Sequence, residues 1–103
     1  MDEPRQILAL NSLNEVLRGL TPTQTVRYLL QKRADIELLE TACSNCRAFP
    51  GSNRRLLREC ILVVLDELGA DEFETRIGIE PNVARLLLRE LADDAYPLGT
   101  GLR

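Results

Sequence analysis

Three cysteines are the residues of this chain whose type and spacing best suit chemistry. Cys43 and Cys46 form a CxxC pair, and Cys60 lies fourteen residues beyond it. Redox CxxC pairs sit at helix N-termini, where the dipole lowers the thiol pKa, but this pair falls near the end of an expected helix. Structural zinc needs four Cys or His ligands, and the chain has three Cys and no His. We predict buried, slowly reacting thiols without metal or cofactor, and a metal or redox role is the alternative.

The other residue types do not point to an enzyme. The absence of histidine removes the commonest general base and the commonest metal ligand. The sequence has no nucleophile with a base beside it and no glycine-rich phosphate loop. A chain of 103 residues also offers only a small core in which to form a pocket. We therefore predict a non-enzymatic protein.

The helix expected at residues 53–68 organises the rest of the chain. Its centre, Cys60–Leu65, is a run of six apolar residues, and no Gly or Pro interrupts residues 52–68. That length is ordinary for a helix and uncommon for a strand. Ser52 or Asn53 is the expected N-cap, and Gly69 the expected left-handed residue at the end. Because the centre is apolar all round, we expect burial on every face.

The N-terminal half is expected to supply two or three helices. The first should span residues 4–18 and end at Gly19, with one apolar stripe that Leu8 and Val16 widen. The stripe consists of Ile7, Leu10, Leu13, Leu17 and Leu20. Thr21–Gln24 predicts a capping box with Thr21 as N-cap. Residues 22–47 form either one long helix or two with a break near Ala34–Asp35, and we favour two.

The C-terminal half is expected to continue as helices. A loop at 47–51 should precede the central helix, and a short helix should restart at residue 70. Ile77–Ile79 is the expected turn, and Pro81 opens a last helix. The chain is thus predicted to be all-α, a compact bundle of five or six helices in one domain at 1–92. Residues 93–103, with Pro97, Gly99 and Gly101, are expected to be a flexible tail.

The charges at the ends of the central helix are opposite to those that the helix dipole favours. Three arginines occupy its first turns and two acids its last: Arg54, Arg55, Arg58, Asp66 and Glu67. Each misplaced charge costs roughly 0.3–1 kcal/mol. We predict that these residues bind a partner, a second copy whose helix runs antiparallel about a two-fold axis near Ile61 and Leu62. The alternative is a monomer whose other helices cover residues 53–68.

Residues 73–91 have the pattern of a helix-turn-helix. Phe73 and Ile77 would face the core, Gly78 would make the turn, and Ala84 and Leu87 have the core spacing of the second helix. The side chains that would then face DNA are Asn82, Arg85 and Arg89. Glu74 stands where such motifs usually carry a small residue. Several acids would also repel phosphates: Glu72, Glu80, Asp93 and Asp94. The alternative is an ordinary helical corner.

Overall charge also disfavours nucleic acid as the main partner. The net charge is −3, with nine Lys/Arg against six Asp/Glu in residues 1–58 and four against ten in residues 59–103. An acidic chain is a poor prior for nucleic-acid binding, although its basic half can bind locally. The N-terminus does not resemble a signal peptide, and no apolar run approaches the roughly 18 residues of a membrane span. We expect a cytoplasmic protein without membrane contact.

One local resemblance bears on the biological setting. Residues 20–27, with the sequence Leu-Thr-Pro-Thr-Gln-Thr-Val-Arg, are similar to a helix start in a subunit of the bacterial flagellar master regulator. The likeness covers eight residues and mostly reflects the capping box, and the rest of the chain does not follow that family's order. We predict a regulatory or adaptor protein that acts through protein–protein contacts in bacterial transcriptional control. Direct DNA binding through residues 73–91 is the alternative.

Overall fold

All regular secondary structure in the described part of the chain is helical, which confirms the prediction of an all-α bundle. The computed structural model describes residues 3–45 and 51–95. The helices are α1 (Glu3–Asn14), a π-helical turn η1 (Glu15–Gly19), α2 (Gln24–Leu30), α3 (Arg33–Ser44), α4 (Gly51–Ile77) and α5 (Pro81–Ala95). The radius of gyration is 13.1 Å. Within these residues, no helix is both long enough and apolar enough to cross a membrane.

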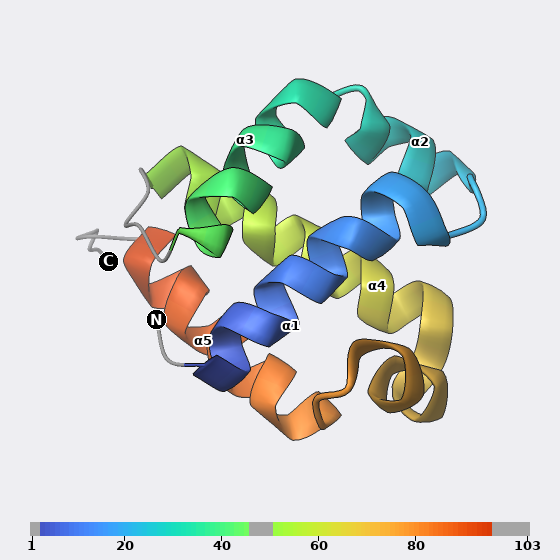
Figure 1. The fold of residues 1–103 in the computed structure, drawn as a ribbon, viewed down its shortest axis with the longest axis vertical. Coiled ribbons are helices and arrows are strands. Elements are labelled where there is room, and N and C mark those ends of the chain that lie inside the picture. The colour runs from blue at the N-terminus through green and yellow to red at the C-terminus, as the bar shows by residue number, and fades with distance from the viewer. Residues whose placement is uncertain (1–2, 46–50, 96–103) are drawn as a thin grey trace.

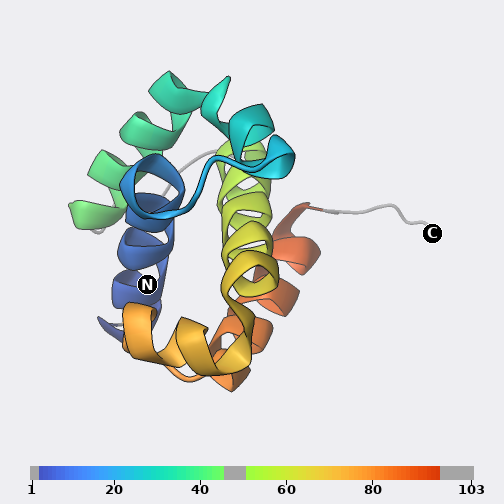
Figure 2. The same cartoon turned by 90° about the vertical axis from the view of Figure 1, so that its right-hand side faces the viewer.

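Helix α4 lies at the centre of the bundle, as the apolar run predicts. It packs most extensively against α5 and α1, and also contacts α3 and α2. Figure 2 shows α4 between α1 and α3 on one side and α5 on the other. Gly69 interrupts it with φ 78° and ψ 166°, a conformation that only glycine adopts readily. The positive φ was expected, and the chain turns there into a second helical segment, residues 70–77 (Figure 1).

The expectation that α4 is buried on every face is wrong. Ile61 and Val64 are fully buried, whereas Leu62 is 40% exposed. Val63 and Leu65 are half-buried at the sides. Because neighbouring residues in a helix point about 100° apart, the six apolar residues cannot all face the small core. The helix therefore presents one partly apolar face to solvent.

The first helix differs from expectation at one residue of its apolar stripe and in its last turn. Its core face is formed by Leu8, Ala9, Leu13 and Val16, while Ile7 is 38% exposed. The rest of the predicted stripe holds, since Leu13 and Leu17 are buried and Leu10 and Leu20 pack against the core. The helix then widens into η1, where the Leu20 amide donates to the Glu15 carbonyl oxygen at 2.7 Å.

The middle of the chain forms two helices, as favoured, with different boundaries. The break lies at Gln31–Lys32, before the predicted Ala34–Asp35. The N-cap of α2 is Thr23 rather than Thr21, because the Thr23 hydroxyl accepts from the Val26 amide at 3.3 Å. Residues 47–50 of the predicted loop lie outside the described residues. Helix α5 begins at Pro81 as predicted and runs to Ala95, and residues 96–103 of the predicted tail are outside the description.

Candidate protein-interaction surface

Two of the three cysteines lie in the hydrophobic core. Cys43 of α3 is 2% exposed, and Cys60 of α4 is fully buried. Cys46 falls outside the described residues. Burial raises the pKa of the Cys60 thiol from its ordinary 9.0 to about 12, and the charge of Glu59 adds to the effect. A thiol held neutral in this way is a small apolar core residue and not a nucleophile.

This pKa gives the folded protein a stability that depends on alkaline pH. The unfolded thiol ionises near pH 9, but the folded Cys60 stays neutral up to about 12. Its contribution is therefore complete below pH 9 and is lost as the pH rises toward 12, by at most about 1.4 kcal/mol per pH unit. Urea unfolding of the wild type and of Cys60→Ala across this range measures the difference. Parallel pH curves for the two proteins would contradict the prediction.

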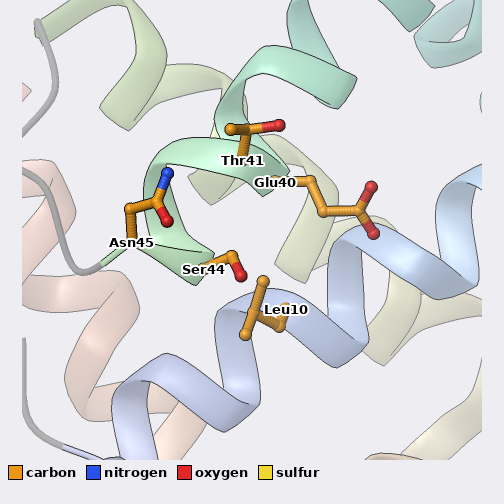
Figure 3. Close-up of a pocket in the computed structure, with 5 residues that line it drawn as sticks. All are labelled: Leu10, Glu40, Thr41, Ser44 and Asn45. Atoms are coloured by element: carbon orange, nitrogen blue, oxygen red, sulfur yellow. The ribbon is translucent and has the colours of Figure 1, made fainter.

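A shallow cleft of about 340 Å³ lies between α1 and the C-terminal end of α3. Figure 3 shows Leu10 on one side and four polar residues on the other: Glu40, Thr41, Ser44 and Asn45. The Glu40 carboxylate accepts from Arg18 Nη1 at 3.1 Å and from Nη2 at 3.3 Å. That pairing raises the pKa of Arg18 and offsets the charge of the carboxylate. The cleft therefore offers a few polar groups and no activated one. No sequence pattern indicated it.

The solvent side of α4 combines apolar and charged residues from the central segment. Arg55, Leu62 and Asp66 are exposed, and Arg58 is half-buried. We call these four residues the outer α4 face. Arg58, Leu62 and Asp66 follow one another at intervals of four, so they form one row along the helix. The Nε atom of Arg58 is buried and has no hydrogen-bond partner within the described residues. The row thus places a cation, a leucine and an anion next to each other.

The other two residues predicted to bind a partner, Arg54 and Glu67, lie at different places on α4. Arg54 is half-buried one turn before Arg58, at the edge of the row. Glu67 is exposed on another side of the helix, near α2, and its Oε2 accepts from the Thr23 hydroxyl at 3.1 Å. Three of the five residues thus share one face with Leu62, and Glu67 instead contacts a neighbouring helix.

The corner between α2 and α3 adjoins the outer α4 face. Lys32 Nζ lies 3.7 Å from Glu59 Oε2 of α4 and 5.1 Å from the centre of the Tyr28 ring. Tyr28 is 55% exposed. Lys32 therefore connects an exposed aromatic ring with the helix that carries Leu62. Aromatic residues are enriched at protein-interaction surfaces, so the exposed Tyr28 extends the candidate surface.

The C-terminal helices have the order expected of a helix-turn-helix. Phe73 and Ile77 are buried in the second segment of α4, and Gly78 has φ 82°. Ala84 and Leu87 are buried in α5. The three predicted DNA-facing side chains, Asn82, Arg85 and Arg89, are all exposed. Arg85 Nη1 donates to Asn82 Oδ1 at 3.0 Å, so these side chains lie together on one side of α5.

An ion pair that the sequence did not indicate fixes the second segment of α4 to η1. Arg76 Nη2 donates to Glu15 Oε1 at 2.6 Å and to the Gly19 carbonyl oxygen at 3.3 Å. The Glu15 side chain is 11% exposed and that of Arg76 is 35% exposed. A Cβ atom at Gly19 would collide with the Glu15 carboxylate, so a larger residue there would require that side chain to shift. Asn11 Nδ2 adds a hydrogen bond to the Ile77 carbonyl oxygen at 2.8 Å.

Comparison of the chain with protein families, with curated proteins and with solved structures gave no match.

Proposed function

We propose that this protein is a non-enzymatic regulatory or adaptor protein that acts through protein–protein contacts, as a homodimer. The observation that carries the proposal is the outer α4 face, where Leu62 is 40% exposed between Arg58 and Asp66. A role in bacterial transcriptional control forms part of the proposal, and it rests on the local likeness of residues 20–27 and on the helix order of residues 73–91. Affinity capture followed by mass spectrometry tests the proposed protein–protein contacts. The Leu62→Asp variant serves as the control bait.

The order of residues along the outer α4 face makes this face complementary to the same face of a second copy. Arg58 lies four residues before Leu62, and Asp66 lies four residues after it. In an antiparallel pair with its two-fold axis at Leu62, each Arg58 meets Asp66 of the other copy, and the two leucines meet at the axis. The axis falls at Leu62 rather than Ile61, because Ile61 is buried in its own bundle. The antiparallel dipoles also offset the reversed end charges.

Reversing one charge of the outer α4 face should weaken the dimer, and reversing its partner charge as well should restore it. Arg58→Glu places like charges opposite Asp66 at both ends of the pair, so we expect the dimer dissociation constant to rise about tenfold or more. Adding Asp66→Arg restores opposite charges and should recover most of the affinity. Sedimentation at micromolar concentrations measures both. Arg33→Glu is the control, because Arg33 is exposed on α3 and paired within its own helix to Glu37 at 3.4 Å. A monomeric wild type, or a dimer indifferent to both changes, would refute this arrangement.

Direct DNA binding through α5 is the second candidate function. The exposed Asn82, Arg85 and Arg89 on one side of α5 favour it. Glu72 and Glu80, exposed in the segments that precede α5, oppose it because they would repel phosphates. A gel shift with duplex DNA at several salt concentrations distinguishes the two functions. Retention that disappears when Arg85 and Arg89 are both alanine, with the fold intact, would favour the DNA-binding protein.

A further inference from the structure

A second partly apolar surface lies on the solvent side of α5. Leu86 is 50% exposed, although the opposite side of the same helix is buried through Ala84, Leu87 and Leu91. Val83, three residues before Leu86, is half-buried and packs at the edge of the core. Residues three apart in a helix are neighbours on its surface. The core therefore continues outward through Val83 to an exposed leucine.

The charged side chains around Leu86 make this surface positive. Arg85 and Arg89 are exposed on one side of Leu86, and the hydrogen bond from Arg85 to Asn82 holds one guanidinium along the helix. Glu90 follows on the other side, but Arg5 of α1 binds its carboxylate with two hydrogen bonds, Nε to Oε1 at 2.9 Å and Nη2 to Oε2 at 2.6 Å. Because Arg5 offsets this acid, the exposed side of α5 is positive around Leu86 over residues 82–90.

We infer that the outer α5 face, defined as Asn82, Arg85, Leu86 and Arg89, binds an acidic amphipathic helix of a protein partner. The apolar stripe of that helix would cover Leu86 and Val83, and its carboxylates would pair with Arg85 and Arg89. This inference rests on the proposed function, since it names the class of protein that the regulator would bind. The outer α4 face remains available for the second copy.

An acidic helix fits this face better than duplex DNA does. An exposed leucine in the middle of the face gains by burial against apolar side chains and has no hydrogen bond to offer a base edge. Glu72 and Glu80 lie in the segments that lead into α5, where an extended duplex would bring its phosphates close to them. A short helix can end before it reaches these acids.

Titration with designed peptides tests the inference on the full chain. The first probe is a labelled helical peptide of about five turns with leucines along one side and glutamates beside them. The second replaces the glutamates by lysines, and the third is duplex DNA of about two helical turns. Fluorescence anisotropy should show binding of the glutamate peptide alone. Added salt should weaken this binding, because charge pairing contributes to it.

Variants of α5 assign the binding to this face. Changing Arg85 and Arg89 together to alanine, or Leu86 alone to alanine, should raise the dissociation constant of the glutamate peptide about tenfold or more. Arg33→Ala is the matched control and should leave the affinity unchanged, since Arg33 lies on α3. Unchanged circular dichroism of each variant excludes unfolding as the cause.

Three results would overturn the inference. They are no binding of the glutamate peptide up to about 1 mM, equal binding of the lysine peptide, or preferential binding of DNA that the double arginine change abolishes. Sedimentation of the same samples separates the two proposals. A protein that dimerises but does not bind the peptide disproves this inference alone, whereas a monomer that binds the peptide disproves the dimer alone.

Discussion

Replacing Ile61 by alanine is expected to lower the free energy of unfolding by about 2–4 kcal/mol. Ile61 is fully buried at the centre of α4, so the shorter side chain removes apolar contacts and leaves a cavity in the core. The adjacent change, Leu62→Ala, should cost about 1 kcal/mol or less, because Leu62 is 40% exposed in the isolated chain. Two neighbouring residues of one apolar run would then differ severalfold in their contribution to stability.

Urea unfolding at low protein concentration measures both changes without a contribution from dimerisation. When the same two variants are compared by sedimentation, the order of their effects on dimer affinity should be the reverse of the order of their effects on stability. Leu62→Ala should weaken the dimer more than Ile61→Ala does, provided that both variants remain folded. Equal losses of stability at the two positions would show that α4 is covered on all sides.

Removal of the Arg76 guanidinium is expected to lower the free energy of unfolding by about 2 kcal/mol. The change Arg76→Met leaves the Glu15 carboxylate, whose side chain is 11% exposed, without its cation. Loss of one partner of a fully buried pair costs about 3–5 kcal/mol, and the partial exposure of Arg76 reduces that figure. The second segment of α4 would then be held in the bundle chiefly by the buried Phe73 and Ile77 and by the hydrogen bond from Asn11 of α1 to the Ile77 carbonyl oxygen.

A double-mutant cycle isolates the ion pair. Glu15→Gln in the Arg76→Met background should cost less than it does in the wild type, because the partner charge is already absent. Arg33→Met is the matched control, since it removes an exposed pair with Glu37 and should change stability by about 0.5 kcal/mol or less. Additive effects of Glu15→Gln and Arg76→Met would show that the two side chains stabilise the fold independently.

Much of the helical architecture follows from local sequence. Pro81 and Gly78 mark a helix start and a turn, and the structure has both there. The uninterrupted apolar run predicts the central helix. Its exposure could not be predicted, because the sequence does not show how many neighbouring helices reach each side of α4. The same ambiguity explains the exposure of Ile7 in α1, where apolar residues are consecutive at positions 7–10.

The candidate surfaces were predictable only in part. The reversed end charges indicated α4 as a candidate interaction site, and the core spacing of residues 73–91 indicated the exposed side of α5. The exposure of Leu86 depends on which neighbours α5 packs against, so the pattern alone did not predict it. The pairs Glu15–Arg76 and Arg5–Glu90 join residues 61 and 85 positions apart. No local rule connects such distant residues.

The contact between Arg5 and Glu90 can form only after residue 90 has been synthesised, long after residue 5. Translation at roughly 5–20 residues per second separates the synthesis of these two residues by roughly 4–17 seconds. At the start of that interval the twelve-residue α1 lacks all of α4 and α5, against which it packs, and a helix of this length is marginal by itself. We therefore expect α1 to dock late on the ribosome and to be accessible to chaperones and proteases until α5 has emerged.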